Sequence, residues 1–286
     1  MITTRTRALL DRYALASRSL SRLSGERLAT ESGQSVEFHD FRPYQAGDEL
    51  RYVDWRVYAR TGRLYTRLYQ AERNIALHIV LDTTPSMSLG HKARYARLTA
   101  QLLSYVAQRD SVAQVHLFDA QQSRPVQGRE HVRDAWSFIE DAPVTAAYPG
   151  EALRAFALNT RFAAGAGLAL IISDLFDENS LQPALVALRA RGLDASFLHL
   201  MAREDLEPDP GQLELIDLEN GDKLRVGPDE VQAYRRTVHT FIERTRGAIL
   251  RAGFRHTLLR VADESDEILE KRAFAALIKA GILIKR

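Results

Sequence analysis

The chain has 286 residues, of which 45% are hydrophobic and 27% charged, and its formal net charge is +2. This composition is typical of one large globular domain, alone or with an accessory piece. The absence of cysteine excludes disulfides, thiolate zinc sites and cysteine nucleophiles. No apolar run approaches the roughly 20 residues of a membrane span, and the N-terminus lacks the apolar core of a secretory signal, so we expect a cytoplasmic protein.

Residues 1–74 are expected to form an accessory segment. They hold 13 arginines and 9 acidic residues, a net +4, which leaves −2 for the rest of the chain. Because acids and arginines are interleaved, we expect no nucleic-acid partner. Residues 4–23 read as a helix, Leu50, Val53 and Val57 suit a short helix, and residues 64–69 alternate like a strand that forms a hairpin with the strand from residue 75.

Charged residues recur through the second half of this segment. We interpret them as an ion-pair network that ties the segment to the sheet, since arginine–carboxylate pairs are the usual way to bury such charges. A docking surface for a partner is the alternative. Trp55 is expected to be packed rather than exposed. The residues of this set are Arg42, Asp48, Arg51, Asp54, Trp55, Arg60 and Glu72.

Residues 75–286 alternate between strand and helix patterns, which predicts a doubly wound, mostly parallel α/β sheet with helices on both faces. A hairpin with Asn220-Gly221 at its turn is expected over residues 213–226. The expected strands are 75–81, 111–119, 167–173, 195–201 and 254–261, with a short edge strand at 123–126. The expected helices are 92–108, 131–140, 151–162, 181–191, 229–251 and a last one from residue 266.

The loop after the first of these strands is rich in oxygen donors. Residues 75–81 are an apolar run, and Asp82, Thr84 and Ser86 follow it directly. Ligands of open α/β sheets bind beyond the carboxyl ends of the strands, and one carboxylate with two hydroxyls favours a hard cation such as Mg²⁺. The alternative for these side chains is capping of the next helix.

An ordered series of short motifs resembles the series found in a known family. It runs from Glu37-Phe38 through Arg42-Pro-Tyr, Gly47-Asp48, Asp54-Trp55, Ala59-Arg60 and Glu72 to the loop Asp82-Thr-Thr-Pro-Ser-Met. The series is similar to that of the bacterial "domain of unknown function 58" family. The resemblance implies a von Willebrand factor A-like fold and a non-enzymatic interaction domain encoded beside a MoxR-type AAA+ ATPase, with chaperone-like maturation or assembly of a client protein as the shared task.

The resemblance also implies a metal-ion-dependent adhesion site (MIDAS). Asp82, Thr84 and Ser86 match its first loop, and Asp174 matches its last aspartate by its position after an apolar strand. The second loop departs from the pattern, because Ala146-Ala147-Tyr148 stand where relatives carry a threonine, unless Thr145 takes that role. We therefore expect a degenerate Mg²⁺ site.

We expect an adaptor in which a partner carboxylate completes the coordination of the cation. The alternative is a Mg²⁺-dependent phosphatase with Asp82 as nucleophile and Asp174, Asp177 or Glu178 as metal ligands. Thr84 speaks against it, since a threonine at this position cannot act as a general acid, and no suitably placed lysine is evident. His78, His116 and His199 lie within separate strands, which favours core histidines over a catalytic group.

Overall fold

The structure is a computed structural model that describes residues 2–16, 36–71, 75–119, 121–144, 151–162, 167–207, 213–216, 223–226 and 228–285. The chain divides into two compact units. One is Ser24–Asn74, and the other joins Met1–Leu23 to Ile75–Arg286. The first 23 residues thus group with the main unit, whereas the sequence suggested a single accessory segment up to residue 74.

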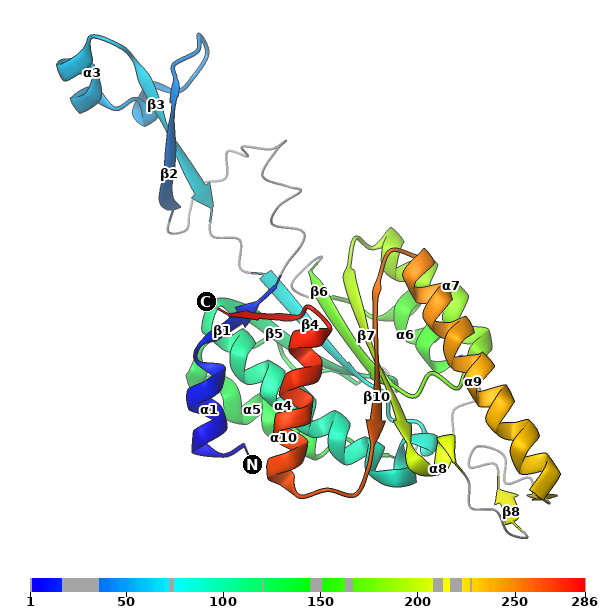
Figure 1. Cartoon of the computed structure of the whole chain (residues 1–286). Helices are drawn as coiled ribbons and strands as arrows, with labels where there is room; N and C mark the ends of the chain where they lie inside the picture. The colour runs from blue at the N-terminus through cyan, green and yellow to red at the C-terminus, as the bar shows by residue number, and fades with distance from the viewer. Residues whose placement is uncertain are drawn as a thin grey trace. The chain divides into compact units, whose positions relative to one another are not determined.

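The main unit is built on a five-stranded sheet in the order β10-β7-β6-β4-β5 (Figure 1). Every neighbouring pair is parallel, which confirms the predicted fold class. The strands are β4 (Ile75–Leu81), β5 (Ser111–Leu117), β6 (Leu168–Ser173), β7 (Asp194–Ala202) and β10 (Arg255–Val261).

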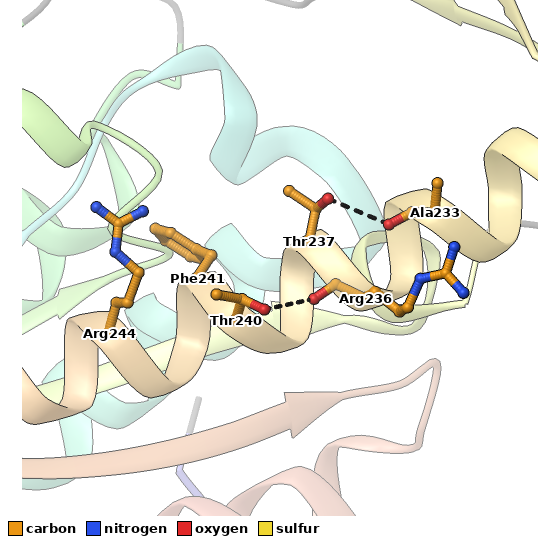
Figure 2. Close-up of a pocket in the computed structure, with 6 residues that line it drawn as sticks. All are labelled: Ala233, Arg236, Thr237, Thr240, Phe241 and Arg244. Carbon is orange, nitrogen blue, oxygen red and sulfur yellow. Dashed lines mark hydrogen bonds between the residues drawn. The ribbon is translucent and has the colours of Figure 1, made fainter.

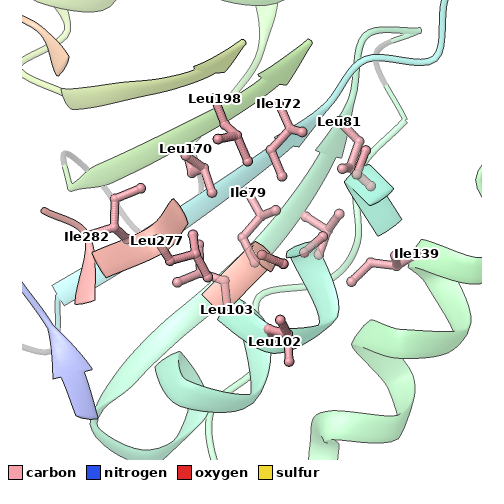
Figure 3. Close-up of a cluster of buried hydrophobic side chains, with 14 of the residues drawn as sticks. Ile79, Leu81, Leu102, Leu103, Ile139, Leu170, Ile172, Leu198, Leu277 and Ile282 are labelled. Carbon is pink, nitrogen blue, oxygen red and sulfur yellow. The ribbon is translucent and has the colours of Figure 1, made fainter. Parts of the chain in front are cut away.

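Helices cover both faces of this sheet because successive strand residues point to opposite sides. Ile79 and Leu81 belong to one buried cluster, to which α4, α5 and α10 contribute Leu102, Ile139 and Leu277 (Figure 3). Val80 belongs to a second cluster with residues of α6, α7 and α9. The helices are α4 (Lys92–Asp110), α5 (Val132–Glu140), α6 (Ala152–Asn159), α7 (Glu178–Ala190), α9 (Pro228–Arg251) and α10 (Asp266–Lys279).

The two ends of the chain pair with each other. Helix α1 (Thr4–Leu10) is followed by β1 (Tyr13–Leu15), which pairs antiparallel with β11 (Leu283–Lys285). The prediction of one helix over residues 4–23 is therefore wrong at Tyr13–Leu15, and residues 17–23 lie outside the described residues. The ring of Tyr13 packs edge-on against Phe274 of α10, with centroids 4.8 Å apart, and the backbone of β1 is satisfied by the C-terminal strand rather than by a further helical turn.

The small unit contains β2 (Val36–Pro43), η1 (Leu50–Tyr52), α3 (Trp55–Thr61) and β3 (Tyr65–Ala71). β3 pairs antiparallel with β2, while β4 pairs with β5 and β6. The predicted hairpin between residues 64–69 and the strand from residue 75 is therefore wrong, because each strand is paired elsewhere.

Ion pairs of the small unit join near neighbours. Arg42 bonds Asp48 at 2.5 Å, and Arg67 bonds Asp54 at 2.9 Å while Asp54 also caps α3. These bonds hold the pKa of both aspartates below the usual value, with the backbone bond from Gln45 the largest cause for Asp48 and the Arg67 bond the largest for Asp54. Arg42, Asp48 and Asp54 of the predicted ion-pair network thus form contacts within the small unit.

The other members of that set lie apart from these two pairs. Arg51 bonds Glu49, Arg60 lies exposed on α3, and Glu72 lies outside the described residues. Trp55 is 54% exposed, so the expectation that it packs is wrong. Its ring meets that of Tyr58 edge-on one turn along the helix.

Short elements complete the main unit: η2 (Pro85–His91), η3 (Arg129–His131), α8 (Arg203–Leu206), β8 (Leu213–Ile216) and β9 (Lys223–Val226). β8 and β9 pair as predicted, and their Asn220-Gly221 turn lies outside the described residues. The predicted edge strand at 123–126 is reduced to isolated bridges such as Val126 with Ala113. None of the helices that the structure describes is long and apolar enough to cross a membrane.

Candidate functional site

The strand order has its switch point between β4 and β6. From β4 the chain moves to β5 on one side, then returns to β6 on the other. Crevices outside the carboxyl ends of strands at such a point are where open α/β sheets bind ligands. Asp82 follows β4 and Asp174 follows β6, so the sheet brings the two acids predicted from the sequence to this position.

Asp82 is held by three short bonds. Its Oδ1 accepts from the backbone N–H and the hydroxyl of Thr84 at 2.8 and 2.6 Å. Its Oδ2 accepts from the Ser173 hydroxyl at 2.5 Å. Because the Thr84 proton goes to Asp82, the Ser86 hydroxyl, 3.0 Å from Thr84 Oγ1, is placed to donate to Thr84. The loop is therefore a preorganised array of oxygens.

Asp82, Thr84, Ser86 and Asp174 line one pocket, together with Ser173, Asp177 and apolar side chains that include Phe176. Its cavity volume is about 20 Å³, enough for a single water molecule or an ion of similar size. The pocket is thus the size of an ion rather than of an organic substrate.

Asp174 has a partner that the sequence did not reveal. The ammonium of Lys92, the first residue of α4, lies 2.8 Å from Asp174 Oδ2 and 2.9 Å from Asp205 Oδ2. Lys92 is fully buried, with Asp174 1% and Asp205 4% exposed. Lys92 is one of only 5 lysines among 39 basic residues, and this unusual choice at the start of a helix is the signal that could have identified it.

These groups carry more negative than positive charge. Asp82, Asp174 and Asp205 set three carboxylates against the single ammonium of Lys92, which leaves two negative charges when all are ionised. Burial first, and the charge of Asp174 second, raise the pKa of Asp82 to about 7. Burial lowers the pKa of Lys92, whereas Asp174 and Asp205 raise it. The net shift is upward. Ionised Asp82 therefore lacks a compensating charge.

Backbone strain is concentrated around the same groups. Of the described residues other than glycine, three have positive φ: His91 at 66°, Glu151 at 62° and Leu175 at 57°. His91 directly precedes Lys92, and Glu151 directly precedes the pocket residue Ala152. Leu175 directly follows Asp174. Such conformations cost about 1–3 kcal/mol each and gather at functional sites, which supports a ligand-binding role for this end of the sheet.

The donor set suits a hard divalent cation. Carboxylate and hydroxyl oxygens are the ligands that Mg²⁺ prefers, and a charge of +2 balances the excess of two negative charges. Over the described part of the chain, no group of three or more His, Cys, Asp or Glu side chains is arranged to hold a metal, so hydroxyls, water or a partner must complete the coordination. Residues 145–148, where the second-loop ligand is in question, lie outside the described residues.

A larger hollow of about 340 Å³ lies along α9 (Figure 2). The described residues that line it are Ala233, Arg236, Thr237, Thr240, Phe241 and Arg244. Thr237 and Thr240 donate to carbonyls one turn earlier, so the arginines are its main polar feature. Phe241 stacks on Phe176 with centroids 5.3 Å apart, which connects this hollow to the ion-sized pocket through two rings.

The three strand histidines are core residues, as predicted. His78, His116 and His199 are at most 1% exposed. His78 bonds His116 at 3.0 Å and His199 bonds His256 at 3.1 Å. Burial lowers the pKa of His116 and His199 to about 3 and that of His256 to about 4, so these three histidines are neutral near pH 7.

Comparison with known proteins gives a family. The model described as "Protein of unknown function DUF58" matches residues 40–248. The chain belongs to this family. Uncharacterized proteins of Mycobacterium tuberculosis and Mycobacterium bovis are 28% identical over 209 residues. The match covers 70% of this chain and 66% of each relative, just under two thirds of their length.

Among solved structures, the DUF58 chain is similar to the pilus adhesin SpaC from Lactobacillus rhamnosus GG. The TM-score is 0.36 at 8% identity, covering 62% of this chain and 31% of the adhesin. A likeness at this level carries no argument about function.

Proposed function

We propose that this DUF58 protein is a non-enzymatic interaction adaptor whose Asp82–Asp174 pocket binds Mg²⁺ in a MIDAS-like manner. Asp82, Thr84, Ser86 and Asp174 would hold the ion, and a carboxylate of the partner would complete its coordination. The bound ion would supply a Lewis-acidic anchor for that carboxylate. The observation that carries the proposal is the meeting of these four side chains around one ion-sized pocket at the switch point of the sheet.

Charge and size both support an ion as the ligand. The buried groups have an excess of two negative charges when all are ionised, and burial first, with the charge of Asp174 second, raises the pKa of Asp82. Arg236 and Arg244 lie exposed on α9, and the hollow that they line is connected to the pocket by the Phe176–Phe241 stack. A partner with several acidic side chains is complementary to the bound cation and to these arginines.

The partner that we propose is a MoxR-type AAA+ ATPase, with an unknown client protein as the object of chaperone-like maturation or assembly. The support for this partner is the resemblance of the motif series between Glu37 and Met87, which implies it. The ATPase would bring its own nucleotide site, because the sequence holds no Walker A motif.

The phosphatase alternative gains little support. Lys92 does reach the site, contrary to the expectation from sequence, but it is fully buried and bonded to Asp174 and Asp205. A cavity of about 20 Å³ does not admit a phosphate ester, and Thr84 remains unable to serve as a general acid. Hydrolysis of an aryl phosphate by the purified chain, lost in Asp82→Asn, would reverse this judgement.

The test is capture of the purified ATPase from the same genome by the immobilised chain. We expect capture in Mg²⁺, loss of capture in EDTA, and loss in Asp82→Asn even with Mg²⁺ present. Asp119→Asn is the matched control, because Asp119 follows the neighbouring strand β5 without lining the pocket and should leave capture unchanged. Equal capture by the wild type and Asp82→Asn, with and without EDTA, would reject the metal-dependent adaptor.

A further inference from the structure

Lys92 is the feature of the site that the proposed function does not use. Its ammonium is bonded to Asp174 and Asp205 and lies 5.2 Å from the ring centroid of Phe176. Asp174 is also one of the proposed metal ligands. The same carboxylate is therefore offered to two cations, one tethered to the chain and one from solution.

The second acid is built to retain the ammonium. Asp205 lies in α8, just after β7, and its Oδ2 accepts from the backbone N–H of Ala202 at 2.8 Å as well as from Lys92. The loop before Lys92 packs closely on Ala202, whose N–H Asp205 accepts: a Cβ on Gly90 would lie 2.3 Å from that of Ala202. Asp205 is thus held beside Lys92 independently of Asp174.

A fully buried ammonium cannot simply leave when a metal ion arrives. Removing one partner of a buried ion pair leaves an uncompensated charge, which is strongly unfavourable. With two acids available, the ammonium can weaken its bond to Asp174 and still be neutralised by Asp205. A lysine with one acid would lack this option, so the pairing of two acids with one lysine has a functional consequence.

We propose that Lys92 is a positioning residue that competes with the divalent cation for Asp174, and that Asp205 retains its ammonium when the cation binds. This inference rests on the proposed Mg²⁺ site. It makes metal affinity depend on the geometry of α8, because any movement of Asp205 changes how strongly Lys92 holds Asp174.

The first test is calorimetric titration of the full chain with Mg²⁺ alone. Asp205→Asn leaves Asp174 as the sole carboxylate for Lys92 and should weaken binding about tenfold, within the range usual for coupled sites. The double variant Lys92→Met/Asp205→Asn removes both the competitor and its second acid, so its net charge equals that of the wild type. It should bind at least as tightly as the wild type.

The second test separates competition from a general effect of charge. The chain has only 5 lysines, so the nitrogen spectrum of ¹⁵N-lysine-labelled protein is simple, and the buried Lys92 is assigned by its loss in the double variant. We expect the Lys92 signal to shift on addition of Mg²⁺ in the wild type and to stay fixed in Asp82→Asn. A structural role alone would not produce this shift.

The outcomes are distinguishable. Calorimetric binding of Mg²⁺ with an unmoved Lys92 signal, or with equal affinity in Asp205→Asn, overturns the competition while the proposed function stands. Binding by neither the wild type nor the double variant overturns both. Binding by the double variant but not by the wild type supports competition and rejects Mg²⁺-dependent docking by the native protein.

Discussion

At the scale of single residues, the contact between Lys92 and its two acids decides the character of the site. The ion pairs are buried and directional, and they join residues 82 and 113 positions apart in the chain. Sequence patterns identified Asp82 and Asp174 because each follows an apolar strand. They could not identify Lys92 or Asp205, because the neighbouring sequence does not indicate that a residue will bond to a side chain from a distant strand–helix unit.

Replacing Lys92 alone should be costly for stability. Lys92→Met leaves two buried carboxylates without a counter-ion, and breaking a buried pair in this way costs about 3–5 kcal/mol. Urea unfolding followed by circular dichroism measures this loss.

The double variant Lys92→Met/Asp205→Asn is the control, because it removes one charge of each sign. It should recover part of the lost stability. A Lys92→Met protein within about 1 kcal/mol of the wild type would show that the acids are neutralised in another way.

At the scale of elements, long apolar strands and periodic helices follow from the sequence, whereas short strands do not. β4 and β6 are buried on both faces and are recognisable as apolar runs. β1 and β11 have three residues each and exist through their mutual pairing, which no local pattern encodes. The hairpin expected from residue 64 failed for the same reason, because β3 and β4 both read as strands but pair with other partners.

The close approach of η2 to the end of β7 gives a prediction for Gly90. Its φ is +57° and an added Cβ would lie 2.3 Å from Ala202 Cβ, so Gly90→Ala should destabilise by about 1–3 kcal/mol, the usual cost of overpacking. Thermal unfolding is the measurement.

Gly281→Ala is a matched comparison, because Gly281 has a similar φ of +64° while its nearest atom would be 4.0 Å away. Gly281→Ala should be destabilised by backbone strain but not by a steric clash. Equal losses in the two variants would contradict close packing between η2 and β7.

At the scale of the whole molecule, the buried histidines His116 and His199 and the partly buried His256 make the fold sensitive to acid. The folded pKa values of about 3 for His116 and His199 and about 4 for His256 lie below the ordinary histidine value of 6.5. At pH values between the folded and the unfolded pKa, the unfolded chain binds more protons than the folded protein. Stability therefore falls as pH drops below about 6.5, by about 1.4 kcal/mol per pH unit for each histidine.

The raised pKa of Asp82 acts in the opposite direction, because its protonation below about pH 7 relieves a cost of burial. Burial also raises the pKa of Asp205, which acts in the same direction as Asp82, and we expect the three histidines to outweigh these two acids. Thermal melts from pH 7.5 to pH 5 should therefore show a falling Tm, and His131→Gln, which replaces an exposed histidine, should leave the profile unchanged. A Tm that is flat or that rises towards pH 5 would contradict neutral His116, His199 and His256 in the folded protein.

The pairing of β1 with β11 links the order of synthesis to the completion of the fold. Tyr13–Leu15 emerge from the ribosome early, yet the strand that covers them, Leu283–Lys285, is made some 270 residues later. Until then Tyr13 lacks the helix against which its ring packs. During synthesis β1 must therefore remain without its partner strand while the residues between Leu15 and Leu283 are made.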